Sequence, residues 1–230
     1  MLVFVDFEHA SRYERDGGER MLAARTRLTY RLEDLSGRHC HLVRYDRIDD
    51  ALLDTLGATA IFVSGNSVSP DAYADDEIEP VSTIIRDTAL PVFGFCGGFQ
   101  LIARAFDADV VALPPADELG DDPMVVTTDS GRSFEYGYHP VDLDPQQAGH
   151  PLLAGLGEPV FRHAHGFHVP HLPDGFVNLA STAATPNQLA VHDDRRIVGT
   201  QFHPEYWTDE HPAGQALIAN FLGWAGVVAN

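Results

Sequence analysis

The sequence predicts an α/β fold in which a mostly parallel central sheet is flanked by helices and antiparallel strands follow in the C-terminal half. Up to residue 113, apolar runs of strand length alternate with longer stretches of helical spacing, the pattern of a parallel sheet covered by helices on both faces. After Leu113-Pro114-Pro115, short alternating runs are separated by turns rich in Gly, Asp and Pro. This second pattern is typical of antiparallel strands. A chain of 230 residues with no repeat and no linker predicts one domain over residues 1–230.

The individual elements follow from these runs. Strands are expected at residues 2–6, 41–45, 60–63, 92–95 and 110–112 in the parallel part, and at 124–127, 141–143, 176–180, 188–192 and 197–202 in the antiparallel part. A helix is expected over residues 19–35, where apolar side chains recur at helical spacing before Ser36-Gly37. Further helices are expected over residues 78–87 and from residue 100 onward.

The run Gly94-Phe95-Cys96-Gly97-Gly98 joins a predicted strand to a predicted helix. This is the layout of a nucleophile elbow, in which the turn is so sharp that the flanking positions cannot carry side chains. The nucleophile then lies at a helix N-terminus, which favours a thiolate. The alternative is a buried structural Cys beside a tight turn, since motifs this short also match by chance.

A predicted base and its orienting group lie near the other end of the chain. A strand that stops at Pro204 carries His203 and Glu205 two residues apart. A Cys nucleophile needs a base to take its proton, and the base needs a third group to fix its tautomer and offset its charge. Cys96, His203 and Glu205 supply these three groups, so the sequence predicts a catalytic triad rather than an isolated structural His.

These two motifs, in this order and about 100 residues apart, resemble those of class I (triad-type) glutamine amidotransferases. The resemblance covers nearly the whole chain and implies a flavodoxin-like fold whose C-terminal antiparallel strands extend the sheet, with a closing helix over residues 216–222. It also implies an oxyanion hole built from Gly65, Asn66 and Gly97. Gln100 and His165 match family residues that contact the substrate.

Several positions depart from the family pattern. Asn66 stands where the second glycine of the oxyanion loop is usual, and Ala164 stands where a Ser is usual. Gly97 follows the Cys in place of Leu or Tyr, and Phe99 precedes Gln100 in place of His or Met. Asn tolerates a left-handed backbone better than most residues, so a donor amide is expected to survive at Asn66. The chemistry is thus retained, and the identity of the amide substrate is left open.

The histidines at residues 163, 165, 168 and 171 raise the question of a metal site. In an extended segment His163 and His165 would share one face, and such a pair can bind zinc. No Cys or acid near them in the sequence completes a ligand set. No metal and no cofactor are therefore expected, and the resemblance places His165 at the lip of the glutamine pocket instead.

Composition excludes several classes of partner. The formal net charge is −19 and all fifteen basic residues are Arg. Such a charge repels nucleic acid and anionic membranes, and no apolar stretch is long enough to span a bilayer. The N-terminus does not resemble a signal peptide, and two cysteines, Cys40 and Cys96, exclude a disulfide scaffold. We expect a cytoplasmic protein whose acidic residues form a solvated surface.

The predicted reaction is glutamine hydrolysis through a Cys96 thioester. With no P-loop and no acceptor-activating domain in the sequence, the expected product ammonia passes to a separate synthetase. A free-standing hydrolase of γ-glutamyl compounds with the same triad is an alternative that the changes at Asn66, Gly97 and Ala164 keep open. A non-catalytic regulatory protein of the same fold is a third possibility, against which the intact triad speaks.

Overall fold

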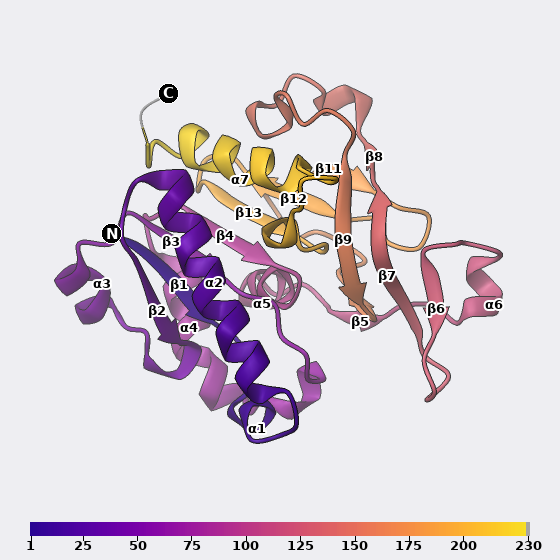
Figure 1. The fold of residues 1–230 in the computed structure, drawn as a ribbon, viewed down its shortest axis with the longest axis horizontal. Helices are drawn as coiled ribbons and strands as arrows, with labels where there is room; N and C mark the ends of the chain where they lie inside the picture. The colour runs from indigo at the N-terminus through magenta and orange to yellow at the C-terminus, as the bar shows by residue number, and fades with distance from the viewer. Residues whose placement is uncertain (229–230) are drawn as a thin grey trace.

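The computed structural model describes residues 1–228, and its centre is an eight-stranded sheet. In spatial order the strands are β2 (Cys40–Arg44), β1 (Leu2–Asp6), β3 (Ala60–Val63), β4 (Val92–Phe95), β13 (Ile197–Thr200), β12 (Leu189–His192), β11 (Val177–Ser181) and β8 (Asp142–Leu143). The first five run parallel to one another and the last three pair antiparallel. Figure 1 shows this twisted sheet with helices on both sides.

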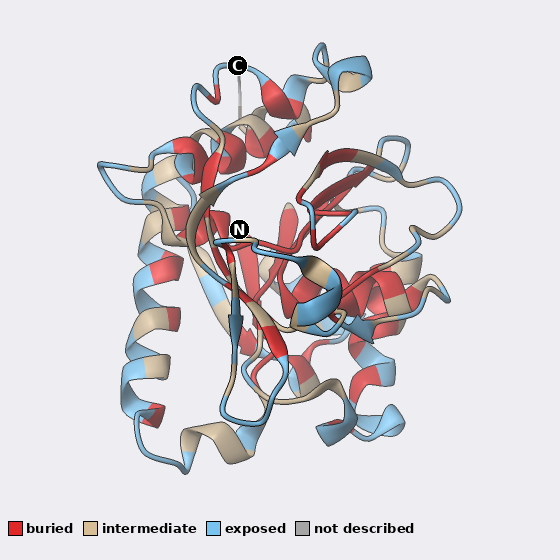
Figure 2. Ribbon diagram, turned by 90° about the vertical axis from the view of Figure 1, so that its right-hand side faces the viewer, coloured by how far each residue is buried: buried red, intermediate tan, exposed pale blue. Residues whose placement is uncertain are grey.

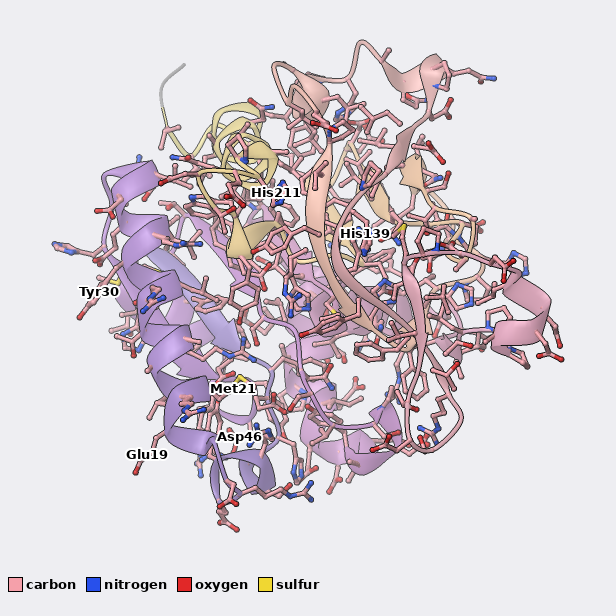
Figure 3. All side chains as sticks on the ribbon, turned by 45° about the vertical axis from the view of Figure 1, so that its right-hand side comes forward. Glu19, Met21, Tyr30, Asp46, His139 and His211 are labelled. Atoms are coloured by element: carbon pink, nitrogen blue, oxygen red, sulfur yellow. The ribbon has the colours of Figure 1, made fainter. Side chains whose placement is uncertain are left out.

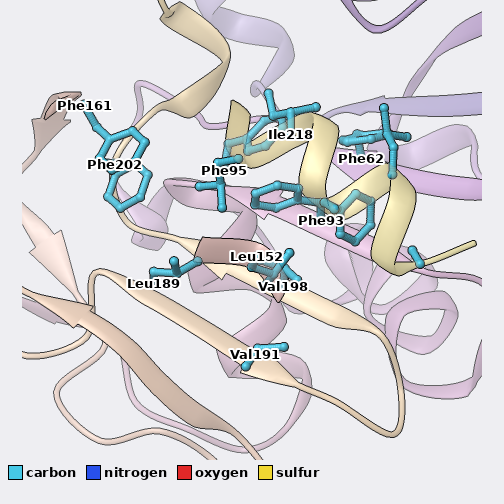
Figure 4. Packing of buried hydrophobic residues seen from close by; sticks show 14 of the residues in the cluster. Phe62, Phe93, Phe95, Leu152, Phe161, Leu189, Val191, Val198, Phe202 and Ile218 are labelled. Atoms are coloured by element: carbon cyan, nitrogen blue, oxygen red, sulfur yellow. The ribbon is translucent and has the colours of Figure 1, made fainter. Parts of the chain in front are cut away.

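Helices cover the two faces of the parallel part. One face packs α2 (Gly18–Ser36) and α7 (Ala213–Trp224) against Phe62, Phe93 and Phe95 (Figure 4). The other face is covered by α3 (Asp50–Leu56), α4 (Asp75–Asp87) and α5 (Gly97–Ala105). Strands β1, β3, β4 and β13 are buried along their whole length, as expected for parallel strands with helices on both faces (Figure 2).

Two smaller sheets stand beside the central one. The first contains β6 (Val125–Thr127), β7 (Ser133–Pro140) and β9 (Val160–His165), and the second pairs β5 (Val111–Ala112) with β10 (Phe167–His168). The remaining short elements are α1 (Ala10–Tyr13), α6 (Ala116–Leu119), η1 (Tyr45–Arg47), η2 (Pro70–Ala72), η3 (Pro145–Gln147), η4 (Pro151–Leu153) and η5 (Pro204–Tyr206). None of the helices within residues 1–228 combines the length and apolar character needed to cross a membrane.

The α/β class and the strands at 2–6, 60–63 and 92–95 are confirmed. Three predictions were wrong in detail. The run at 110–112 was placed with the parallel strands, but it forms only β5, which pairs antiparallel with β10 outside the main sheet. The run at 197–202 was expected to be antiparallel. Its strand β13 ends at Thr200 and pairs antiparallel with β12, but on its other side it runs parallel to β4. The run at 124–127 does not extend the main sheet, because β6 pairs with β7.

Candidate active site

The turn from β4 to α5 is the sharp elbow that the sequence predicts. Cys96 has φ 49° and ψ −104°, an uncommon backbone conformation for a residue with a side chain, and its N–H donates to Thr200 O at 2.6 Å. A Cβ on Gly94 would lie 2.6 Å from the carbonyl carbon of Gly98. Because the backbones approach this closely, side chains are excluded at the two flanking positions. The surrounding β4–α5 packing therefore holds the Cys96 thiol at the start of α5.

His203 and Glu205 follow β13, the strand next to β4. His203 Nδ1 lies 2.7 Å from Glu205 Oε1, and both side chains are buried. The backbone is fixed on both sides, because His203 N donates to Arg162 O at 2.7 Å and Arg31 Nη1 donates to Glu205 O at 2.7 Å. The structure thus brings the predicted base and orienter together beside the predicted nucleophile.

The electrostatics of this group favour a charged imidazole. Burial alone lowers the pKa of His203, but the charges of Glu205 and Cys96, with hydrogen bonds to both, outweigh it and raise the pKa to about 10. A protonated His203 beside the sulfur is the state in which a thiolate is stabilised and a departing amine can be protonated.

Gln201 is a neighbour of the sulfur that the sequence analysis did not single out. Its side chain is buried, and its Nε2 lies 3.6 Å from Cys96 Sγ. Its Oε1 accepts a hydrogen bond from Gln100 Nε2 at 3.3 Å, and Gln100 Nε2 also contacts Phe167 O at 3.1 Å. The predicted substrate residue Gln100 is therefore connected to the sulfur through Gln201.

The predicted oxyanion residues lie against the Cys and the His. A Cβ on Gly65 would lie 2.8 Å from His203 Cε1 and 3.3 Å from Cys96 Cβ, and a Cβ on Gly97 would lie 2.0 Å from Asn66 Oδ1. Within residues 1–228, neither the N–H of Asn66 nor that of Gly97 donates a hydrogen bond. The φ of Asn66 is not positive, so its amide is presented without the left-handed backbone that Asn would tolerate. Two free N–H groups thus lie side by side near the sulfur.

A buried ionic group holds the loop that carries Gly65. Arg25, on α2, donates from Nη2 to Gly65 O at 2.7 Å and from Nε to Asp6 Oδ1 at 2.9 Å. Glu8 Oε2 accepts the N–H of Ser67 at 2.9 Å and lies 3.9 Å from the Arg25 guanidinium. The loop is therefore fixed on both sides of the Asn66 peptide. Sequence reasoning missed these residues because Arg25 and Gly65 are 40 positions apart.

A cavity of about 750 Å³ opens in front of these groups. Cys96, His203, Gly65, Asn66, Gln100 and His165 all line it, Gly97 borders a small adjoining pocket, and Glu205 lies behind His203. One wall comes from α2, where Met21 points toward the cavity while Glu19 and Tyr30 point away from it (Figure 3). The opposite wall is the face of β7 and β9 that carries Phe134, Tyr136, Arg162 and Ala164.

Comparison with known proteins decides the family. The sequence model of the family "Glutamine amidotransferase class-I" matches residues 24–223. The chain belongs to the class-I glutamine amidotransferase family. It is accordingly an amide-hydrolysing enzyme of the glutamine amidotransferase type.

Several relatives of this amidotransferase carry a more specific name. A GMP synthase (glutamine-hydrolysing) of Synechococcus sp. strain CC9311 is 33% identical over 172 residues, 74% of this chain and 28% of that protein. One of Rhizobium johnstonii is 30% identical over 203 residues, 86% of this chain and 34% of that protein. The chain thus spans roughly a third of the length of the curated relatives it matches.

Solved structures resemble it along nearly their whole length. A protein of Thermoplasma acidophilum, described as a proposed subunit of GMP synthase, superposes with a TM-score of 0.69 at 25% identity, covering 99% of this chain and 95% of that one. The glutaminase domain of Trypanosoma brucei CTPS, solved with bound acivicin, has a TM-score of 0.64 at 17% identity, covering 100% and 96%. At 17% identity, the similarity to the Trypanosoma brucei domain shows a shared fold and nothing more.

The surroundings of the histidines on β9 differ from those expected from the sequence. His163 and His165 do lie on one face of β9, but an acid is close to them, contrary to the sequence-based expectation. Glu135, on the neighbouring strand β7, places Oε2 2.8 Å from His165 Nε2. Burial alone would raise the pKa of Glu135. The hydrogen bond and charge of His165, together with two threonine hydroxyls, outweigh burial and lower the pKa to about 2. The acid was missed because β7 was not predicted.

Proposed function

We propose that this amidotransferase hydrolyses glutamine through a thioester on Cys96. The sulfur attacks the side-chain carboxamide carbon, and the N–H groups of Asn66 and Gly97, in the turns that follow Gly65 and Cys96, hold the oxyanion. Preorganised donors of this kind are commonly worth about 3 kcal/mol each. His203 protonates the departing ammonia and then activates the water that releases glutamate. Glu205 keeps the His203 ring oriented and offsets its charge.

One observation carries this proposal more than the others. The strained Cys96, the buried His203–Glu205 pair and two unpaired backbone N–H groups lie together beside one cavity, which Cys96, His203 and Asn66 line directly. A structural Cys would need neither the raised pKa of His203 nor the free donors. Gln100 and His165, which line the same cavity, are proposed to contact the amino-acid part of the substrate.

The ammonia acceptor is proposed to be a synthetase on a separate polypeptide. Support comes from the names of the relatives, which are glutamine-hydrolysing GMP synthases, and from the Thermoplasma neighbour, which is named as one subunit of such an enzyme. The docking face would be the rim of the cavity, formed by residues 64–70, the turn after Cys96 and residues 206–211.

A free-standing γ-glutamyl hydrolase is the second candidate, and the cavity favours it. About 750 Å³ lies in the range of pockets for ligands much larger than one amino acid. Arg132 and Arg162 line it, and neither side chain is paired with a carboxylate among residues 1–228. They could receive an anionic group on a larger γ-glutamyl compound.

Steady-state kinetics of the isolated chain separates the two candidates. We would measure glutamate release from glutamine and from a series of γ-glutamyl amines, with Cys96→Ser as the control for contaminating activity. The subunit proposal predicts slow turnover of glutamine that rises when the synthetase is added. Fast turnover without a partner, or a clear preference for γ-glutamyl amines, would reject it in favour of the free hydrolase.

A further inference from the structure

Three buried side chains form a compact cluster between β7 and β9. Glu135 lies directly opposite His165 in the strand register, and His163 lies opposite Gly137, so the three side chains share one face. Their exposed fractions are 0%, 3% and 0% for Glu135, His165 and His163. One ligand atom from each lies within 4.8 Å of the others. Two imidazoles and one carboxylate are a common protein ligand set for zinc.

The hydrogen bonds of His165 point to a cation beside its second nitrogen. Nδ1 lies 3.1 Å from Phe167 O, and a carbonyl can only accept, so Nδ1 carries the proton. Nε2 lies 2.8 Å from Glu135 Oε2, a contact that is an ion pair when the ring carries a second proton. In a neutral ring this brings two lone pairs together, which a positive ion between them would relieve. Histidines that bind metals commonly donate their other N–H to a backbone carbonyl in this way.

His163 supplies a second free ligand. It is fully buried, and neither of its ring nitrogens has a hydrogen-bond partner within residues 1–228. Buried polar groups are normally paired, so a fully buried imidazole with two unpaired nitrogens calls for an explanation. Two more buried polar atoms nearby lack a partner, Ser133 Oγ and His168 Nδ1. Ser133 lies on the same face of β7, and the His168 ring is close enough for the charges of Glu135 and His165 to affect its pKa.

The carboxylate of Glu135 is held in place by neighbours that are not ligands. Thr182 Oγ1 donates to Oε1 at 2.6 Å, while Thr185 Oγ1 and Gln188 Nε2 donate to Oε2 at 2.8 and 2.9 Å. Hydrogen bonds of this kind commonly orient a metal-binding carboxylate. Because His165 also lines the cavity, an ion has a route to the cluster from solvent.

We propose that Glu135, His163 and His165 bind a zinc ion. Two imidazole nitrogens with one carboxylate suit zinc, whereas magnesium and calcium prefer oxygen ligands alone. Zinc–ligand bonds of about 2.0–2.1 Å at tetrahedral angles place ligand atoms roughly 3.4 Å apart. Binding would therefore open the 2.8 Å contact between His165 Nε2 and Glu135 Oε2 to about this distance. The ion would tie β7 to β9 at the inner lip of the cavity and fix His165 there, separate from Cys96.

The test uses the full chain with Cys96→Ser, so that the thiolate cannot bind the ion. Zinc would be titrated calorimetrically, and cobalt would be followed by its visible absorption. We expect one equivalent to bind, with the affinity reduced at least about 100-fold by His163→Met. His171→Gln, which alters an exposed histidine, should bind like the parent.

A second variant guards against misfolding of His163→Met. Zinc should raise the melting temperature of the Cys96→Ser protein and chelation should reverse this, and Glu135→Gln should abolish the shift while keeping its native circular dichroism. Absence of a one-equivalent binding event in the parent would overturn the proposal. Equal zinc binding by the parent and the folded Glu135→Gln or His163→Met variant would overturn it as well.

Discussion

Replacing Glu205 with glutamine should move the alkaline limit of glutamine hydrolysis to lower pH. His203 must carry a proton to release ammonia, and the alkaline limb of kcat/KM reports the loss of that proton in the free enzyme. Burial lowers the pKa of His203, and the charges of Glu205 and Cys96 raise it to about 10. Glu205→Gln keeps the side-chain shape and an acceptor for His203 Nδ1 but removes the charge.

The magnitude follows from the 2.7 Å contact between His203 Nδ1 and Glu205 Oε1. A charge-assisted hydrogen bond contributes about 1.5–3 kcal/mol. Each pKa unit corresponds to about 1.4 kcal/mol, so the limb should move by about 1–2 pH units, from near pH 10 to between about pH 8 and 9. The plateau rate should fall less than in His203→Ala, because the orienter is usually the least critical member of a triad.

The assay is glutamate release measured between about pH 6 and about pH 10.5, with enzyme stability checked at each end. Glu210→Gln is the matched control, because Glu210 is an exposed acid in the same segment of the chain. Its profile should coincide with that of the parent. An unchanged alkaline limb in Glu205→Gln would refute the assignment of Glu205 as the group that keeps His203 protonated.

Three further predictions concern the loop around Gly65 and the second cysteine, Cys40. Gly65→Ala should lower kcat at least about 10-fold, because its methyl group would lie 2.8 Å from His203 Cε1. Gly149→Ala is the control: its methyl group would have nothing within 4 Å, so kcat should not change in the same assay. Arg25→Met should lower kcat about 10²–10³-fold by releasing the loop around Asn66, and should cost about 3–5 kcal/mol in chemical denaturation because Asp6 loses its buried partner. Cys40 should resist iodoacetamide at pH 8 in the native protein, because burial raises its pKa to about 12; modification of Cys40 seen by peptide mass spectrometry would contradict this.

The parts of the site that the sequence predicted are those that local sterics determine. Glycines at Gly94 and Gly98 are required by the close approach of β4 to α5, and the spacing of His203 and Glu205 around Pro204 is short enough to fix their contact. The three buried strands that were predicted without error are continuous apolar runs, which a parallel sheet requires. In each case the residues that determine the local structure lie within a few positions of one another in the sequence.

The parts that were missed depend on contacts between distant segments. Arg25 lies in a helical pattern that does not reveal that its side chain is buried against Gly65. Glu135 belongs to a strand whose mixed polar and aromatic sequence contains no apolar run. The strand was therefore not predicted, and neither was the pairing of Glu135 with His165. The insertion of β13 between β4 and β12 is likewise a matter of topology, because an apolar four-residue strand can pair in either direction.

Trapping the covalent intermediate would show whether Cys96 is the nucleophile. Wild-type protein would be mixed with glutamine, quenched in acid during turnover and digested for mass spectrometry, with Cys96→Ser treated in parallel. We expect a glutamyl adduct on the peptide that contains Cys96, no adduct on the peptide that contains Cys40, and no glutamate release from the Cys96→Ser protein. Hydrolysis that persists in Cys96→Ser, or an adduct on Cys40 alone, would contradict it.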